Sequence, residues 1–570
     1  MKLLRVDMSQ LKARWEAVPP VYARLGGRAL TSKLLLEEVP PTCAALGPHN
    51  KLILAPGLLG GAGVTTAGRL SVGAKSPLTG GVKEANAGGT VGDLLGKLGV
   101  KAVVVEGQAQ KGELFVLHVK GASAELLPAG DLRGLGTYAT ADRLQAQYGA
   151  SCTVVSIGQA GEYLMQGASI ACTGEGDQRS NHAARGGLGA VMGSKGLKAI
   201  VVHKAAGQTV PLADAELLRT AARRFAQELI NDPKTGQKGS QHLYGTASIV
   251  AAVNEMGSLP TRNFSSGSFE QAADLRGEQL REITLARGGL VGTRCMPGCV
   301  IACRNLYVDA SGQPIVGTLQ YETIALLGAN LGLSNLDDVA RLNYLCNDFG
   351  LDTIETGAAL GVAIEAGLAQ FGDFASIAGL LQQVGEGTVL GRLIGSGAAT
   401  TGRVLGVRRV PAALGQAMPG YDPRSLKGNG VTYATSPMGA DHTAGNAFGA
   451  RKEVNPLAVH GQRELSRRLQ IIAAMLDSTG LCLFARPPVI ADPQLMVDMI
   501  NGIYGWGWTK EDLDRFNRDV LRTELEFNRR AGITAADYRL PEYMREEPLP
   551  PHNATFDVPD AELDAVFDTL

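Results

Sequence analysis

Short apolar runs, each closely followed by glycine, dominate the first 205 or so residues of the chain. Runs rich in Val, Ile and Leu predict strands over residues 51–55, 101–106, 113–119, 152–157 and 198–203. The segments between them, such as GLLGGAGVTTAGRLSVGAKSPLTGG, contain too much Gly and Thr for helices. We therefore expect a β-rich domain over residues 1–208.

The pattern changes near Pro211, where apolar residues begin to recur with the period of a helix. Helices are predicted over residues 213–232, 335–347, 353–370, 463–476 and 510–530. A second Gly- and Pro-rich stretch at 414–430 indicates another boundary, and the proline-rich tail is expected to wrap the surface. The chain thus reads as α+β, with mostly helical domains over 209–415 and 416–570 after the β-rich one.

Two segments of the helical region repeat one pattern. LNYLCNDFGLD (342–352) and IAAMLDSTGLC (472–482) each place an apolar helix before Gly, Leu and an Asp or Cys. Glycine at a helix C-terminus readily adopts the left-handed conformation that ends the helix. Two equivalent helix ends would present backbone groups to two equivalent halves of one ligand, and two ordinary glycine caps are the alternative.

Composition and charge narrow the class of protein. The 570 residues are 45% hydrophobic and 19% charged, which is typical of a globular chain with an ample core. Lys plus Arg number 54 and Asp plus Glu 55, so charge gives no reason to expect nucleic acid or an anionic membrane as partner. No apolar run of about 18 residues predicts a membrane span, and the N-terminus lacks a secretory signal's apolar core. We therefore expect a cytoplasmic protein.

Closely spaced cysteines form the sharpest local signal: Cys295, Cys299 and Cys303 in TRCMPGCVIACRN. Thiolates bind soft metals and iron–sulfur clusters, and the intervening Pro and Gly allow the chain to wrap around one. A cubane needs a fourth ligand, for which Cys482 at the end of the second repeat is the best candidate. Buried unpaired cysteines or a four-cysteine zinc site are the alternatives, although zinc sites usually use C-x2-4-C pairs.

Two glycine-rich loops, LILAPGLLGGAG and NHAARGGLGAVMGSKG, invite a dinucleotide-binding interpretation. A dinucleotide site needs a helix directly after the glycines and an acidic residue at the end of the next strand. The first loop is followed by neither, and the glycines of the second loop precede a strand, so that interpretation fails. Both regions place cations near bare backbone N–H groups, with Arg69 and Lys75 in one and Arg185 and Lys195 in the other. This combination suits phosphate oxygens, and surface arginines with turn glycines are the alternative.

Two ionisable residues lie in apolar or glycine-rich surroundings of the helical half. Glu322 in GTLQYETIALLG has no basic residue near it in sequence, and burial there would raise its pKa and suit it to acid–base chemistry. His442 lies in YATSPMGADHTAGNAFGA, a loop of small residues that could line a pocket. The alternatives are a helix-surface Glu and a hydrogen-bonded loop His.

Motifs spread over nearly the whole chain resemble one known family in order and spacing. They are GGRAL (26–30), GRLSVGAKSPLTGG (68–81), NAGG (86–89), IGQAGE (157–162), RGGLGAVMGSKGLKAI (185–200), YET (321–323), NDFGLD (347–352), KGNGVTYATS (427–436), ADH (441–443), DSTGLC (477–482) and FNRRAG (527–532). The family is that of the aldehyde:ferredoxin oxidoreductases. Many motifs in one order are far more specific than any single motif.

The resemblance implies a twisted β-saddle domain carrying two pyranopterins, which hold tungsten or molybdenum, and two helical domains with one [4Fe-4S] cluster. Magnesium could bridge the pterin phosphates. It assigns the cluster to Cys295, Cys299, Cys303 and Cys482. The cofactor-binding residues expected from the motif match and the cationic loops are Arg69, Lys75, Asn86, Gly88, Arg185, Gly186, Gly187, Asn347, Gly350, Leu351, Asp352, Asp477, Gly480 and Leu481.

The implied reaction is oxidation of a small aldehyde to a carboxylic acid, or the reverse. His442 would hold the carbonyl, Glu322 would accept a proton, and electrons would pass through the cluster to ferredoxin or a ferredoxin-like subunit. A homodimer is a possible assembly. The alternatives are the catalytic subunit of a reductase complex, acting for example on an aromatic CoA thioester, and an electron-transfer iron–sulfur subunit that has lost its metal–pterin.

Two departures from the family pattern indicate a side branch. The cysteines are spaced C-x3-C-x3-C where the best-known members have C-x2-C-x3-C, and the first repeat begins with Asn347 where Asp is usual. The loop around His442 is also unusually small and polar, so the substrate pocket is expected to differ. Substrate is the property that transfers least reliably between relatives.

Overall fold

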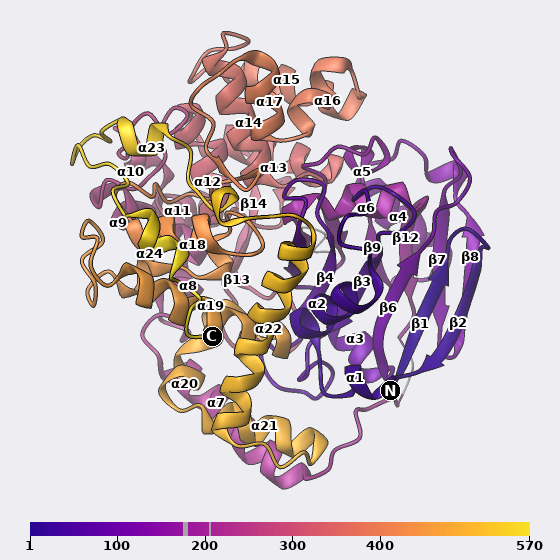
Figure 1. The fold of residues 1–570 in the computed structure, drawn as a ribbon. Helices are drawn as coiled ribbons and strands as arrows, with labels where there is room; N and C mark the ends of the chain where they lie inside the picture. Colours follow the sequence, from indigo (N-terminus) through magenta and orange to yellow (C-terminus); the bar gives the residue numbers. More distant parts are fainter. Residues whose placement is uncertain (175–180, 205–206) are drawn as a thin grey trace.

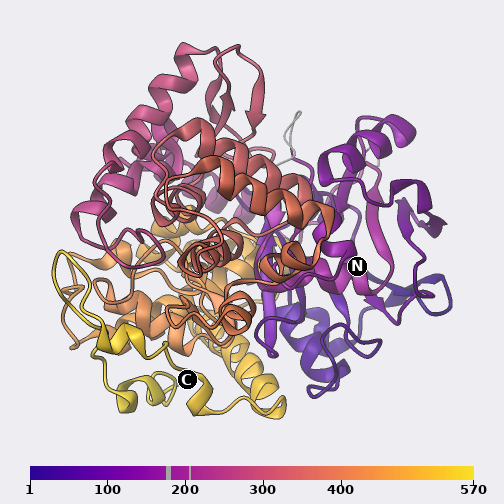
Figure 2. The same cartoon turned by 90° about the horizontal axis from the view of Figure 1, so that it is seen from above.

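The computed structural model describes residues 1–174, 181–204 and 207–570. Strands of two sheets, coloured indigo to purple, occupy one side of the molecule, and helices make up most of the other side (Figure 1). The view from above shows the same separation (Figure 2). The predicted α+β architecture is therefore confirmed.

Two six-stranded sheets form the N-terminal part, and they share one topology. In each sheet, the first two strands in the sequence form an antiparallel hairpin at one edge. The first of them also runs parallel to a strand that comes late in that part of the sequence, and all other pairs are antiparallel. The first sheet has the order β2 (Lys12–Ala17), β1 (Lys2–Asp7), β6 (Val100–Glu106), β3 (Leu52–Pro56), β4 (Leu70–Lys75), β5 (Val82–Ala87). The second has β8 (Ser123–Pro128), β7 (Phe115–Lys120), β12 (Leu197–Val202), β9 (Thr153–Ser156), β10 (Ile170–Cys172), β11 (Asn181–Ala183).

The helices of this part are duplicated as well. Helices α2 (Gly27–Glu38) and α4 (Thr137–Tyr148) follow the two hairpins, and each covers the outer face of its own sheet. Helices α3 (Val91–Lys97) and α6 (Leu188–Ser194) precede the last strand of each unit and share a core with both sheets. The strands are apolar on both faces because both faces are covered.

The parallel ladders contain the same irregularity in both units. The register of β1 against β6 skips Lys101, and the register of β7 against β12 skips Lys198. Both lysines are buried and donate from Nζ to a backbone carbonyl, of Ala23 at 2.9 Å and of Leu135 at 2.8 Å respectively. The two sheets are thus two copies of one structural unit.

The five strands predicted from apolar runs are present, and in the described residues the two six-stranded sheets contain seven further strands that were not predicted. Strands β2 and β8 are largely exposed along their length, so they lack a continuous apolar run. Helix α2 was missed because its buried side includes the polar residues Arg28, Thr31 and Ser32, which weaken the helical period. Helix α6 begins directly after Gly187, inside the second glycine-rich loop, where the sequence indicated only that the glycines precede a strand.

The helical part contains the five predicted helices, now bounded as α7 (Ala215–Asn231), α13 (Leu336–Phe349), α14 (Thr353–Glu365), α19 (Gln462–Thr479) and α22 (Lys510–Arg530). Helix α7 packs against α21 (Gln494–Tyr504). Its apolar side belongs to a core that also contains Leu58 and Leu59 of the N-terminal part. Segments far apart in sequence therefore share this core.

No single helix within the described ranges is long and apolar enough to cross a membrane. Only the pair Gln462–Thr479 and Leu483–Ala491, bent by 113°, reaches the required length and composition together.

Candidate active site

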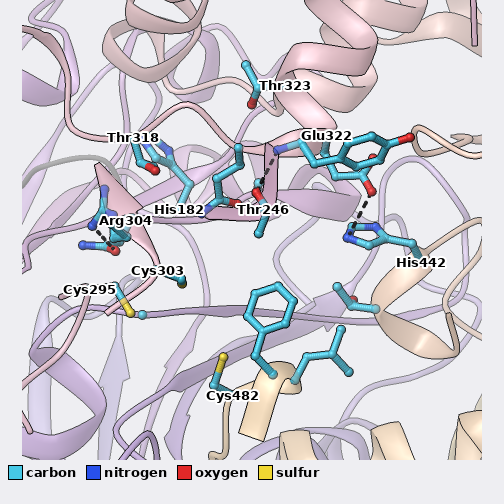
Figure 3. A pocket seen from close by; sticks show the side chains of 18 of the residues that line it. His182, Thr246, Cys295, Cys303, Arg304, Thr318, Glu322, Thr323, His442 and Cys482 are labelled. Atoms are coloured by element: carbon cyan, nitrogen blue, oxygen red, sulfur yellow. Dashed lines mark hydrogen bonds and ion pairs between the residues drawn. The ribbon is translucent and has the colours of Figure 1, made fainter. Parts of the chain in front are cut away.

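A cavity of about 320 Å³ lies between strands β5 and β11, which contact each other, and the helical part. Its walls contain many of the residues predicted for the site, and Figure 3 shows the cysteines and the Glu322–His442 pair around it. The predicted residues that line it are Arg69, Asn86, Gly88, Cys295, Cys303, Glu322, Asn347, Leu351, His442, Asp477 and Cys482. Those outside the lining are Lys75, Arg185, Gly186, Gly187, Cys299, Gly350, Asp352, Gly480 and Leu481.

The two sequence repeats are two helix ends with the expected conformation. Helix α13 ends at Gly350 with φ of 74°, and α19 ends at Gly480 with φ of 82°, both left-handed. Gly350 packs against Gly158 after β9, and Gly480 packs against Gly57 after β3, where a Cβ on Gly57 or Gly158 would collide with backbone. Each helix end therefore docks on the equivalent loop of one sheet unit. The side chains just before and after each glycine are thereby placed at the cavity.

Backbone hydrogen bonds fix both docked ends. The amide of Arg69 donates to the carbonyl of Gly480 at 3.2 Å, and the amide of Ser169 donates to the carbonyl of Gly350 at 2.8 Å. On the second repeat, the amide of Cys482 donates to the carbonyl of Thr66 at 2.9 Å. This last bond holds a predicted cluster ligand against the first sheet.

A charged network surrounds the second helix end. Arg69 donates from Nε to the side-chain oxygen of Asn86, whose Nδ2 donates to Asp477 at 2.7 Å. The fully buried Arg28 pairs with Asp477 at 3.3 Å and with Glu524 at 2.7 Å. Burial raises the pKa of Asp477 to about 6 despite both arginines. Burial and the neighbouring Asp477 raise the pKa of Glu84 to about 8.

Arg185 is turned away from the cavity. Its guanidinium donates to the carbonyls of Ala440 at 2.5 Å and Ala417 at 2.6 Å, and to Asp352 at 3.2 Å. Asp352 in turn caps helix α14 by accepting from the amide of Ile354. These two residues therefore join the second sheet unit to the loop before His442.

Lys75 and the Gly186–Gly187 pair also serve packing within the protein. Lys75 donates from Nζ to the carbonyl of Pro41, away from the cavity lining. Gly186 has φ of 81°, and a Cβ on it would collide with the side chain of Lys83. Gly187 has φ of 73° and faces the carbonyl of Gln166. The glycines of this loop are thus required by the protein's own close contacts.

Glu322 and His442 face each other across the cavity wall. The Oε1 atom of Glu322 lies 3.5 Å from Nε2 of His442, and its Oε2 accepts from the amide of Gly420 at 2.7 Å. Burial raises the pKa of Glu322, although His442 and the Gly420 amide oppose the shift. Oε1 has no hydrogen-bond partner among the described residues, so a polar group of a substrate or water can bind there.

A buried carboxylate with fixed partners precedes His442 in the chain. Asp441, which is buried, has an oxygen 3.8 Å from Nδ1 of His442 and accepts from both the amide and the hydroxyl of Thr443. The fully buried Lys83 donates to its other oxygen at 2.7 Å. Burial alone would raise the pKa of Asp441, but Lys83 and Arg185 hold it well below its usual range. The carboxylate is therefore a fixed negative charge beside the histidine.

The four predicted cluster cysteines are all free thiols. Cys295, Cys303 and Cys482 line the cavity, whereas Cys299 lies buried beside Cys295. In the part of the chain that the structure describes, no three His, Cys, Asp or Glu side chains meet at a point suited to one metal ion. Cys43, Cys152, Cys172 and Cys346 lie outside the cavity lining, and Cys346 belongs to the main helical core.

Several residues of the site escaped sequence reasoning. Lys83 lies in β5, a strand that was not predicted. His182 lies in β11 and lines the cavity, three positions before Arg185. Tyr421 lines the cavity with its ring centroid 6.3 Å from that of His442. The repeated segments GKLGVKAVVV (96–105) and GSKGLKAIVV (193–202) were the available signal, because they reveal the duplication that relates β5 to β11.

Comparison with known proteins agrees with this architecture. Residues 3–204 match the family described as "Aldehyde ferredoxin oxidoreductase, N-terminal domain", and residues 220–569 match "Aldehyde ferredoxin oxidoreductase, domains 2 & 3". The tungsten-containing aldehyde ferredoxin oxidoreductases of Thermococcus kodakarensis and Pyrococcus furiosus are each 33% identical, over 96% of this chain and 92% of their own length.

More distant similarities extend to other substrates. An aliphatic sulfonate oxidoreductase, WOR-like subunit, of Pyrococcus furiosus is 25% identical over 90% of this chain and 82% of its own. The active site complex BamBC of benzoyl coenzyme A reductase shares the fold, with a TM-score of 0.81, 19% identity, and coverage of 99% of this chain and 93% of its own. The two family matches together span nearly the whole chain. It therefore belongs to the aldehyde ferredoxin oxidoreductase family and is an oxidoreductase of that type.

Proposed function

We propose that this protein uses a tungsten or molybdenum bis-pyranopterin and one [4Fe-4S] cluster to oxidise an aldehyde to a carboxylic acid. Ferredoxin or a ferredoxin-like subunit would accept the electrons. The observation that carries the proposal is that one cavity brings the predicted groups together. It joins the Glu322–His442 pair, three of the four predicted cluster cysteines and the residues flanking both docked helix ends. The similarity to tungsten-containing aldehyde ferredoxin oxidoreductases supports tungsten as the metal and an aldehyde as the substrate.

The cavity suits a large, doubled, polar cofactor. The protein offers the same elements twice, a sheet unit with a helix end docked on it, as a ligand with two equivalent halves requires. Buried polar atoms of lining residues, including those of His182, Gln241 and His442, lack partners among the described residues and are available to a bound ligand. Arg69, Asn86 and Asp477 would hold one half, and Asn347 and Leu351 the other.

The cysteines suit a cluster better than a single zinc ion. In a cubane each thiolate binds a separate iron, so the sulfurs surround a volume, whereas zinc draws four ligands to one point at about 2.3 Å. Cys295, Cys303 and Cys482 all line the cavity, and in Figure 3 Cys482 lies on a different segment from the neighbouring Cys295 and Cys303. Cys299 would complete the set after a small movement of its loop.

When bound, the metal–pterin would take up the two electrons released as an aldehyde gains oxygen from water, a reaction that also releases two protons. The protein's own residues would supply orientation and proton transfer. His442 would hold the carbonyl oxygen through Nε2, and Glu322 would accept a proton at its unpartnered Oε1. Burial raises the pKa of Glu322, which makes its carboxylate a better proton acceptor than an exposed one. Tyr421 and Phe484 offer apolar surface for the rest of the substrate.

Elemental analysis of protein purified without oxygen tests the cofactor proposal. We expect about one tungsten or molybdenum and about four iron per chain, as one pterin-held metal and one cubane require. Iron alone, from a host that makes the cofactor, would favour the electron-transfer alternative. Zinc alone would contradict the cluster assignment.

The Glu322→Gln variant tests the catalytic assignment. It should retain tungsten and iron but lose aldehyde oxidation, because the carboxamide cannot accept the proton. Glu162→Gln is the matched control, since Glu162 is also buried but lies outside the cavity lining, paired with Lys198. Unchanged turnover per tungsten in Glu322→Gln would remove Glu322 from the mechanism.

A further inference from the structure

The duplication of the sheet units relates individual residues of the two halves. The shared irregularity places Ala102 of β6 opposite Leu3 and Ala199 of β12 opposite Val116, so Ala102 and Ala199 are equivalent. Following the ladders outward makes Ser71 of β4 equivalent to Ala171 of β10. The next strands then pair these two residues with Asn86 and His182.

Contacts outside the sheets support the same correspondence. Arg69 lies two residues before Ser71, and Ser169 lies two residues before Ala171, so these two residues are equivalent as well. Their amides bind the equivalent carbonyls of Gly480 and Gly350. Their side chains also bind equivalent partners. Arg69 binds the side chain of Asn86, and Oγ of Ser169 lies 2.9 Å from Nδ1 of His182. Asn86 and His182 therefore occupy equivalent places beside the two helix ends.

The ring of His182 is prepared to bind a ligand. Its Nδ1 is bound by Ser169, and its Nε2 is buried without a hydrogen-bond partner within residues 1–174, 181–204 and 207–570. The side chain lines the cavity on the side away from His442 (Figure 3). Burial, reinforced by Arg304, lowers the pKa of His182 to about 4, so the ring is neutral at pH 7. When the Ser169 hydroxyl donates to Nδ1, Nε2 carries the hydrogen and is a buried donor without a partner in the described residues.

We propose that His182 binds the pyranopterin half seated on the first repeat, as the counterpart of Asn86 on the other half. The assignment rests on the bis-pyranopterin proposed above. It replaces the expectation that Arg185, three residues later, makes this contact, because Arg185 is engaged with Asp352 and two backbone carbonyls. The two halves of the cofactor would thus be held by different chemistry, a carboxamide on one side and an imidazole on the other.

Cofactor retention in the holoenzyme tests this role without relying on activity. Wild type, His182→Leu and His182→Gln are purified anaerobically from a host that makes the cofactor, and tungsten or molybdenum and pterin are counted during prolonged dialysis. Loss of one buried hydrogen bond predicts release about tenfold faster in His182→Leu. His182→Gln should release it at nearly the wild-type rate, since its carboxamide supplies an N–H donor. His118→Leu is the control, because His118 lies in β7 of the same sheet and outside the cavity lining.

The outcomes separate this inference from the proposed function. Wild-type protein without tungsten or molybdenum would overturn both. Metal-loaded wild type with an unchanged release rate in His182→Leu would overturn the inference alone. If His182→Leu does not fold, Ser169→Ala takes its place, since it frees the ring while leaving the histidine. Faster release in Ser169→Ala supports the role of His182, and release at the wild-type rate contradicts it.

Discussion

The buried ion pair between Lys83 and Asp441 should determine both stability and catalysis. Nζ of Lys83 lies 2.7 Å from Oδ2 of Asp441, and the two side chains are 0% and 4% exposed. Removing one partner of such a pair costs about 3–5 kcal/mol, because a charge is left buried and unpaired. In Lys83→Met the Asp441 carboxylate keeps two hydrogen bonds from Thr443 and has Arg185 at 4.0 Å. We therefore expect the lower end, about 3 kcal/mol.

The same change should impair turnover, because Asp441 adjoins His442 in sequence and faces its Nδ1. A displacement of about 1 Å in a catalytic group lowers rates by about 100-fold. We expect a fall of that order in kcat per tungsten for Lys83→Met. The double variant Lys83→Met/Asp441→Asn leaves no unpaired charge and should regain most of the stability while kcat stays low.

Lys198→Met is the matched control for this experiment. Lys198 is equally buried and lies 2.5 Å from its own partner Glu162, but neither residue lines the cavity. It should lower the thermal midpoint without changing kcat per tungsten, measured by thermal denaturation at one scan rate and by aldehyde oxidation normalised to metal content. Equal kcat per tungsten in Lys83→Met and Lys198→Met, or full recovery of kcat in the double variant, would refute the reasoning.

Three further predictions concern the cluster, the buried carboxyl and the docked helix ends. Cys299→Ala should lose iron and cluster absorbance, whereas Cys346→Ala in the helical core should keep both; four irons in the first variant would exclude Cys299 as a ligand. The pKa of Glu84 is raised from about 4.5 in the unfolded chain to about 8 in the fold, so the folded state binds its proton more tightly. The stability that this proton binding provides is fully present below pH 4.5 and is lost as the pH rises through 8. Glu84→Gln should therefore flatten the fall of the thermal midpoint between pH 5 and 8, and an unchanged pH profile would contradict this. Gly158→Ala should destabilise the protein through collision with the backbone of Phe349, and a thermal midpoint equal to wild type would show that the docked end can shift.

Local patterns in the sequence determined the elements that depend on near neighbours. Apolar runs and helical periods gave the α+β architecture, and glycine after an apolar helix gave the left-handed ends at Gly350 and Gly480, since a cap depends on the residues of one turn. Their apolar or glycine-rich surroundings and the YET and ADH motifs made Glu322 and His442 candidates for the site, and the structure places the two side chains 3.5 Å apart.

Tertiary structure alone decided which charged residues reach the cavity. Arg185 and Lys75 looked equally suited to phosphate, but their partners, Asp352 and the Pro41 carbonyl, lie 167 and 34 positions away. Likewise Lys83 meets Asp441 across 358 positions. The direction of a long side chain follows from the carboxylates and carbonyls that packing brings beside it. A buried charge without a partner is costly, so each of these side chains turns toward an oppositely charged or polar group. That group lies on another element, whose position only the tertiary structure sets.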